Sequence, residues 1–267
     1  MKIVEQVSNY NLRATLYSGQ IFRFREGPNG VFKVYSNDKF CYVIQNDHQL
    51  IIEDEMDSNE SYWRNFFSLD FDLSKLDKLV AGNSFLQEVC DFSQGLTLLR
   101  QDPWETLISF IISQQKRIPQ IQECIENLCR IAGFKFPNSD DYEFPTPERL
   151  SYVDLKDVHL GYREKYVATA ANYVSKSLID LNSLKRENGG TYGQAIQALC
   201  EIYGVGIKVA NCVALFSLGH TNAFPVDVHI DRILKLPEMK NFSASNYGDY
   251  AGLLQQYLFN YAIHHGI

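Results

Sequence analysis

The chain has 267 residues, of which 45% are hydrophobic and 21% charged, and its formal net charge is −7. This length suits one large domain or two to three small ones, and the composition is that of an ordinary globular protein. The acidic total excludes a uniformly basic nucleic-acid-binding surface, but it is compatible with a local basic groove.

Membrane and secretion signals are missing from the sequence pattern. No apolar run approaches the ~18 residues needed to cross a membrane, and the start of the chain lacks the apolar core of a signal peptide. The six cysteines form no Cys-x-x-Cys pair, which favours a reduced protein over a disulfide framework.

Four short runs typical of β-strands, separated by turn residues, lie at 20–25, 31–35, 41–45 and 50–53. They predict a small antiparallel sheet. Helices are expected at 59–68 and 82–94. Almost everything from Pro103 onward has a helical period, and Pro103 suits the first turn of a helix that runs to Ser113. The further helices expected are 117–132, 147–153, 163–180, 191–201, 207–217, 227–235 and 245–262. We therefore predict an α+β protein, with an N-terminal antiparallel sheet and flanking helices in 1–102 and a helical helix-hairpin-helix body in 103–267.

The most informative segment is the Gly-Val-Gly turn that precedes Lys208, followed nineteen positions later by Asp227. Each residue alone has an ordinary interpretation: a lysine at a helix start is usually a solvated charge, and an aspartate before Val228 is most often a helix N-cap. His229 alone is more often a capping or packing residue. The combination is more specific, because two glycines at a helix-hairpin-helix turn direct free backbone N–H groups outward, where they can bind a phosphate.

Several short motifs in the same order resemble the 8-oxoguanine DNA glycosylase/lyase family, within the helix-hairpin-helix-Gly/Pro-Asp DNA glycosylase superfamily. They span nearly the whole chain: Ser18–Phe24, Leu98–Pro103, Leu160–Arg163, Leu199–His229, Tyr250–Gly252, Gln255 and Leu258–Phe259. The resemblance implies excision of 8-oxoguanine from duplex DNA and strand cleavage at the resulting site, in base excision repair.

The chemistry of such a reaction matches the residue types. Displacing a base leaves positive charge at C1′ of the sugar, and a neutral lysine amine can attack that carbon to give a Schiff base. An amine does this only if its pKa is lowered by burial or by positive potential at a helix N-terminus. The resemblance assigns the nucleophile to Lys208, the stabilising carboxylate to Asp227 and a phosphate contact to His229.

Base recognition requires a pocket for a nucleotide that has left the stack. By resemblance, the Gly19 carbonyl accepts the N7–H that only 8-oxoguanine has, Phe259 and Cys212 sandwich the base, and Gln255 bonds its Watson–Crick edge. The ordinary alternatives remain: Phe259 as helix core, Cys212 as a small buried hydrophobe and Gly19 as a turn.

Contacts with the rest of the duplex are implied for Gln115, which fills the gap, for the wedge Tyr162, and for Arg163 opposite the lesion. Gly204 and Gly206 belong to the phosphate-binding hairpin. A second family arginine is replaced by Gln120, which puts strict preference for cytosine in doubt. The side chains expected to form a local basic surface are Lys116, Arg117, Arg163, Lys165 and Lys208.

The resemblance also suggests a monovalent cation held by the backbone carbonyls of Cys200, Ile202 and Val205. An iron–sulfur cluster is not expected, because no cysteine follows Cys212. We expect no other cofactor. We expect a monomer that binds double-stranded DNA and no membrane, located in the nucleoid and cytoplasm of a prokaryote or the nucleus of a eukaryote. The alternative functions are a glycosylase for another damaged purine, such as an alkylated one, and a non-catalytic DNA-structure-binding module.

Overall fold

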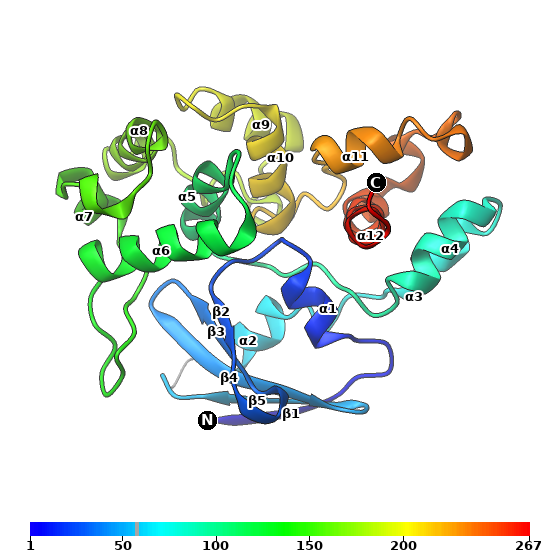
Figure 1. Ribbon diagram of the computed structural model, residues 1–267, viewed down its shortest axis with the longest axis horizontal. Coiled ribbons are helices and arrows are strands. Elements are labelled where there is room, and N and C mark those ends of the chain that lie inside the picture. Colours follow the sequence, from blue (N-terminus) through cyan, green and yellow to red (C-terminus); the bar gives the residue numbers. More distant parts are fainter. Residues whose placement is uncertain (57–58) are drawn as a thin grey trace.

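The computed structural model describes residues 1–56 and 59–267. The predicted α+β class is confirmed: a five-stranded antiparallel sheet underlies a mostly helical body (Figure 1). The strands are β1 (Lys2–Gln6), β2 (Phe24–Glu26), β3 (Phe32–Ser36), β4 (Lys39–Asn46) and β5 (Gln49–Asp54). Their order across the sheet is β1-β5-β4-β3-β2, so the first strand closes one edge beside the last.

The sequence prediction differs from the observed sheet at two places. β1 was not predicted; it is an edge strand in which only Ile3 is fully buried, so its sequence alternates weakly. The run 20–25 is a strand only from Phe24 onward, because the buried Gln20 uses its side chain for loop contacts instead. The other three predicted strands are confirmed, with each end within one or two residues of the prediction.

One face of the sheet is covered by α1 (Leu12–Tyr17) and α2 (Glu60–Phe66). Side chains from both helices share a single apolar core with the strands: Leu12, Leu16, Trp63, Phe66, Val34, Val43, Leu50 and Ile52 are all buried in it. The sheet therefore has its own hydrophobic core, and the helical body packs above it.

The helical body contains α3 (Ser74–Val80), α4 (Ser84–Phe92), α5 (Pro103–Ser113), α6 (Ile118–Ala132), α7 (Pro147–Tyr152), α8 (Arg163–Ser175), α9 (Tyr192–Cys200), α10 (Ile207–Phe216), α11 (Val228–Ile233) and α12 (Ala251–His265). Every helix predicted from the sequence is present, although α1 and α3 were not predicted. The last predicted helix, 245–262, is divided: a 3-10 segment at Ala244–Tyr250 precedes α12. Among the described residues, no helix is long and apolar enough for a membrane span.

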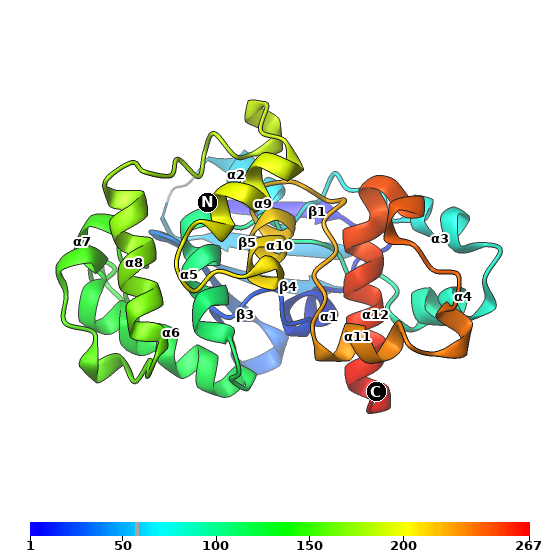
Figure 2. The ribbon, with the colours of Figure 1, turned by 90° about the horizontal axis from the view of Figure 1, so that it is seen from above.

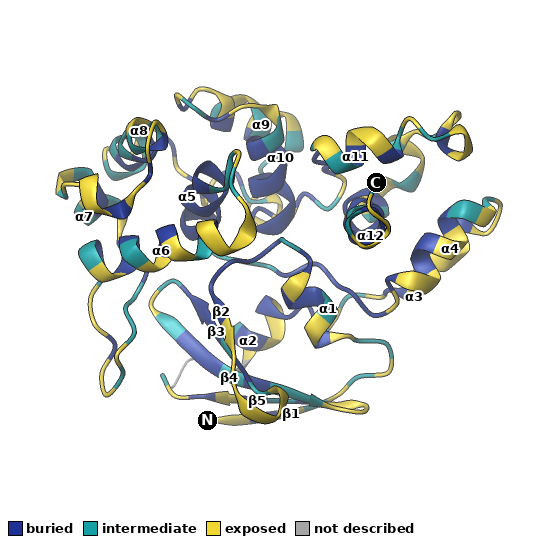
Figure 3. Cartoon of the chain, in the orientation of Figure 1, coloured by how far each residue is buried: buried dark blue, intermediate teal, exposed yellow. Residues whose placement is uncertain are grey.

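α5 and α10 are the most buried helices and form the centre of the body (Figure 3). Seen from above, they lie between α6 to α8 on one side and α11, α12, α3 and α4 on the other (Figure 2). Although α3 and α4 precede residue 102, their buried side chains belong to the core of the helical body, together with α10 and α12. Leu99, by contrast, belongs to the core of the sheet, and Phe22 to the core of the helical body. The division at 102 stays a prediction.

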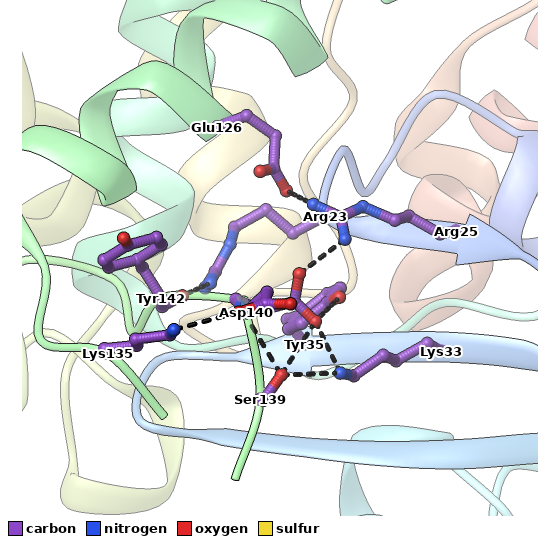
Figure 4. A network of polar contacts seen from close by, with 10 residues as sticks. Arg23, Arg25, Lys33, Tyr35, Glu126, Lys135, Ser139, Asp140 and Tyr142 are labelled. Carbon is purple, nitrogen blue, oxygen red and sulfur yellow. Dashed lines mark hydrogen bonds and ion pairs between the residues drawn. The ribbon is translucent and has the colours of Figure 1, made fainter. Parts of the chain in front are cut away.

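A polar joint fixes the sheet to the helical body (Figure 4). Arg23 is buried; it donates to Glu105 Oε2 of α5 over 3.2 Å and to the Tyr142 carbonyl over 2.7 Å. Burial raises the pKa of the Glu105 carboxyl, and the charge of Arg23 acts against this rise. Because the partners lie far apart in the chain, the joint holds the N-terminal segment 18–23 at a fixed place beneath the helices.

A second carboxylate strengthens the same joint. Asp141 accepts hydrogen bonds from Lys33, from the Tyr35 hydroxyl at 2.7 Å and from Arg25. Burial alone would raise the pKa of the Asp141 carboxyl, but these donors outweigh it and hold the pKa well below its usual range.

Candidate active site

The hairpin between α9 and α10 is the first component of the site. Gly204 has φ +92°, a conformation that glycine adopts easily, and a Cβ atom there would lie 2.1 Å from the ring of Tyr166. Gly206 is exposed and precedes α10 as its N-cap, with open space around it. The first N–H groups of α10 have no partner within the helix, so the turn presents donors at the surface, as the motif predicted.

Lys208 is the second residue of α10 and is partly buried. Its ammonium lies 5.3 Å from the centre of the Phe110 ring of α5. One turn further along α10 stands Cys212, which is buried and contacts Lys208. Burial raises the pKa of the Cys212 thiol, and the neighbouring Lys208 charge partly counteracts that rise. The thiol is therefore a neutral neighbour of the amine.

Asp227 is the N-cap of α11, as its ordinary interpretation predicted, and it also faces the site. Its Oδ1 accepts from the N–H groups of His229 at 3.0 Å and Ile230 at 2.9 Å. These bonds fix the carboxylate, which lines the pocket. The His229 ring bonds the Ile267 carbonyl through Nδ1 at 2.9 Å and lies edge-on to Phe259, 5.8 Å between ring centres.

A single small cavity of about 50 Å³ brings the predicted residues together. Its walls include all six side chains or backbone positions expected for catalysis and base recognition, namely Gly19, Lys208, Cys212, Asp227, Gln255 and Phe259. The remaining lining residues, to which the sequence motifs assigned no role, are Ser18, Phe110, Phe216, Pro225 and Gln256. Their types, mostly apolar and on buried helices, give no signal in the sequence beyond core packing.

The cavity is small in this structure. Its volume of about 50 Å³ is well below the ~150 Å³ of a cavity that holds benzene, so it is too small for a purine as it stands. Gly19 has φ +78°, and a Cβ there would lie 3.2 Å from the Phe259 ring, so the ring rests directly against the glycine. Phe259 must move before a base can stack on it.

The residues on either side of Gly19 have a structural role that the motif alone did not reveal. Gln20 is fully buried and donates to Ser18 Oγ at 2.8 Å and to the Thr97 carbonyl at 2.9 Å, while its own Oε1 accepts from the Leu99 N–H at 2.7 Å. These bonds tie the Gly19 turn to the extended segment 97–101. The motif thus positions a backbone carbonyl rather than a side chain.

The residues expected to contact the duplex lie at the exposed face near the hairpin. Tyr162 is 48% exposed, and its ring meets Tyr166 at 5.6 Å, which in turn meets Tyr203 of the hairpin at 5.2 Å. Gln115 is exposed and adopts φ +52° in the loop after α5. The three tyrosines and this loop form a continuous edge beside Gly204.

Arg163 lies differently from the expectation of a surface contact. It is buried, and its guanidinium donates to the Gln114 carbonyl through Nε at 2.7 Å and through Nη2, and to the Leu160 carbonyl at 3.2 Å. It therefore does not contribute to an exposed basic surface in this structure, unlike the exposed Arg117 and Lys165.

The carbonyls suggested for a cation lie at the end of α9 and in the turn. The Ile202 carbonyl already accepts from the Val205 N–H at 2.9 Å, which leaves it one lone pair. Neutral backbone oxygens are a suitable donor type for a hard cation, and they would hold the ion at Cys200, Ile202 and Val205. Within 1–56 and 59–267, no cluster of three His, Cys, Asp or Glu side chains offers a different metal site. The cation remains a prediction.

A lysine at the hairpin and a carboxylate at the next helix start, both facing one pocket, are the arrangement of the DNA glycosylases that the hairpin motif resembles. Residues 2–107 match the family described as 8-oxoguanine DNA glycosylase, N-terminal domain. N-glycosylase/DNA lyase OGG1 of Arabidopsis thaliana is 32% identical over 234 residues, which are 70% of this chain and 61% of that protein. The match therefore spans less than two thirds of that relative. A probable N-glycosylase/DNA lyase of Methanothermobacter thermautotrophicus is 30% identical over 235 residues, with 75% of this chain and 74% of the relative covered.

Solved structures agree over the full length. MBOgg1 in complex with a low-affinity DNA ligand has a TM-score of 0.90 and 35% identity, covering 100% of this chain and 96% of that one. The Clostridium acetobutylicum 8-oxoguanine glycosylase/lyase, bound to double-stranded DNA with cytosine opposite 8-oxoguanine, has a TM-score of 0.87 and 28% identity, covering 99% of each chain. The chain belongs to the 8-oxoguanine DNA glycosylase family.

Proposed function

We propose that this protein excises 8-oxoguanine from duplex DNA and then cleaves the strand at the resulting abasic site. The observation that carries the proposal is the shared pocket, in which an amine, a carboxylate and the candidate base-reading groups meet. Family membership supports it, as do the names of the relatives and the 8-oxoguanine duplex bound in the Clostridium structure.

The reaction begins with the base in the pocket, after Phe259 has moved off Gly19. The Lys208 amine forms a bond to C1′ as the C1′–N9 bond breaks, and the proton that its nitrogen loses on forming this bond passes to the leaving base. Positive charge develops at the sugar during this step, and the fixed carboxylate of Asp227 stabilises it. Opening of the sugar ring then yields the Schiff base between Lys208 Nζ and C1′.

Strand cleavage follows by β-elimination. A general base removes a proton from C2′, and the electron pair forms the C1′=C2′ double bond of an enamine. The C3′–O bond then breaks, and the strand 3′ to the lesion leaves through its phosphate. Water finally hydrolyses the Schiff base and regenerates Lys208. Both activities thus use one amine, which explains why a site with a single lysine suffices for excision and cleavage.

Discrimination of the lesion from guanine would come from the backbone carbonyl at Gly19. 8-Oxoguanine carries a hydrogen on N7, whereas guanine has a lone pair there, which would repel a carbonyl oxygen. The buried amide network of Gln20 holds this turn, so the carbonyl cannot move away easily. Rigid placement makes the repulsion effective.

The test compares duplexes that carry one 8-oxoguanine, one alkylated purine or one uracil. We expect excision of 8-oxoguanine, strand nicking and covalent trapping on that duplex by borohydride. Lys208→Gln should abolish nicking and trapping while lesion binding persists. Lys78→Gln is the matched control, because Lys78 is an exposed lysine of α3 that lies outside both the pocket and the expected basic surface, so trapping should be unchanged.

Three outcomes would refute the proposal. Full trapping by Lys208→Gln would show that another group forms the Schiff base. Preferred excision of the alkylated purine by the unmodified protein would favour the alternative glycosylase, and binding without any trapping or base release would favour a DNA-structure-binding module.

A further inference from the structure

Gln256 follows Gln255 on α12, and both residues line the cavity that contains Lys208 and Asp227. Each is only 3% exposed. Two adjacent buried amides are unusual in a helix whose other pocket-facing member is the aromatic Phe259. The resemblance assigns a role to Gln255 alone, so Gln256 requires its own explanation.

The two amides are joined by one hydrogen bond: Gln256 Nε2 donates to Gln255 Oε1 at 3.0 Å. This bond turns the carbonyl of Gln255 toward its neighbour and leaves the Gln255 Nε2 as the donor for other partners. If Gln255 alone turned over, its NH2 group would meet the NH2 group of Gln256. Reversal therefore requires both amides to turn together, which stiffens the orientation of Gln255.

The oxygen of the Gln256 amide has no partner to match the bond made by its nitrogen. This atom, Oε1, is fully buried and has no hydrogen-bond partner among the described residues. A buried acceptor without a donor destabilises a protein, so such an atom in a binding pocket indicates a donor that a ligand supplies. The pair as a whole thus offers one donor, on Gln255, and one buried acceptor, on Gln256.

We propose that Gln256 is a specificity-determining residue that, together with Gln255, makes the pocket selective for a guanine-type base over an adenine-type base. A guanine-type edge carries an acceptor at O6 beside a donor at N1, which complements the donor and acceptor of the amide pair. An adenine-type edge carries a donor at position 6 and an acceptor at N1, so it meets the pair with like groups opposed. This proposal rests on the proposed excision of 8-oxoguanine, and it identifies what fixes the base class.

The experiment measures single-turnover excision from two duplexes that differ only in the lesion, 8-oxoguanine or 8-oxoadenine, each opposite cytosine. In Gln256→Leu, the ratio of the two rates should fall about tenfold through slower release of 8-oxoguanine, which corresponds to about 1.4 kcal/mol. Binding to a duplex with a stable abasic-site analogue should change less than about twofold, because that ligand has no base to read.

Asn260→Leu provides the matched control. Asn260 is also a buried amide of α12, but it donates to Ser93 Oγ at 3.0 Å and does not line the cavity. Its loss should lower the melting temperature and leave the rate ratio unchanged. If Gln256→Leu does not fold, Gln256→Met keeps the length of the side chain without its amide, and the same fall in the ratio is expected.

An unchanged ratio in a folded, active Gln256 variant would overturn this proposal alone. A fall in abasic-site binding as large as the fall in excision would overturn it too, because it would show a general structural effect. If the unmodified protein released neither base, the proposed function itself would fail, and this inference with it.

Discussion

Asp227 allows a prediction that separates its charge from its structural role. As the N-cap of α11 it accepts two backbone hydrogen bonds, at 3.0 Å and 2.9 Å. Asparagine caps a helix about as well as aspartate. Asp227→Asn should therefore keep α11 in place and remove only the negative charge beside the sugar.

The expected effect of Asp227→Asn is a fall of about 10²–10³-fold in the single-turnover rate of base release, the range found when one preorganised electrostatic group is removed from a reaction centre. Affinity for the 8-oxoguanine duplex should stay near that of the unmodified protein, because the carboxylate opposes a charge that appears only in the transition state. The melting temperature should change little.

Asp227→Ala supplies the comparison. It removes the cap as well as the charge, so about 1 kcal/mol of stability should be lost, which corresponds to about 2–4 °C in melting temperature for a protein near this size. Thermal unfolding and rapid-quench kinetics measure the two effects separately. An Asp227→Asn variant that releases the base within about threefold of the normal rate would refute the electrostatic role.

Three other substitutions test different parts of the structure. Gly204→Ala should impair both folding of the hairpin and DNA binding, since its Cβ would lie 2.1 Å from the Tyr166 ring; a variant with normal melting temperature and affinity would contradict the packing argument. Asp141→Asn should lower the free energy of unfolding at pH 7. A carboxyl whose pKa is depressed in the folded state stabilises the protein above its unfolded pKa of about 4, and this contribution is lost as the pH falls through the folded-state pKa. In urea unfolding, the variant should therefore differ less from the unmodified protein at pH 3 than at pH 7. Gln120→Arg should sharpen the preference for cytosine opposite the lesion about tenfold or more; a thousand-fold preference already present in the unmodified protein, in single-turnover assays with the four opposite bases, would show that this position does not decide it.

The structure adds a reason to examine position 120. Gln120 Oε1 accepts the N–H of Arg117 at 3.1 Å, at the start of α6. The side chain is exposed and helps to begin the helix. Gln120→Arg would therefore remove a helix-start contact of modest value, and the melting temperature should be measured beside the four excision rates to separate that effect from base preference.

The sequence predicted features that depend on local chemistry. The start of α5 at Pro103 followed from the preference of proline for the first helical turn, and the hairpin followed from its glycines. β1 could not be predicted because an edge strand with one fully buried residue has almost no alternating pattern. α1 is only six residues long, too short for a helical period to be recognised.

The candidate site divides in the same way. The resemblance of the motifs identified the residues that meet in the pocket, including Cys212, Gln255 and Phe259, which lie inside helices and carry no signal of their own. The motifs did not reveal that Arg163 is held by the Gln114 carbonyl, since the direction of a long side chain depends on tertiary contacts. Gln256 carried no signal either; only its hydrogen bond to Gln255 and its unpartnered oxygen distinguish it from helix core.

The small size of the pocket links these observations to the mechanism. In this structure the Phe259 ring rests against Gly19, and the cavity beside it has a volume of about 50 Å³. Opening must separate Phe259 from the glycine turn, which the Gln20 bonds keep fixed, so the movement falls to the aromatic side chain and α12. Gln255 and Gln256 lie on that same helix. In the proposed mechanism, entry of the base and recognition of its edge therefore both depend on α12. An adenine-type base would meet amide groups of like hydrogen-bonding character in the same step in which Phe259 must move.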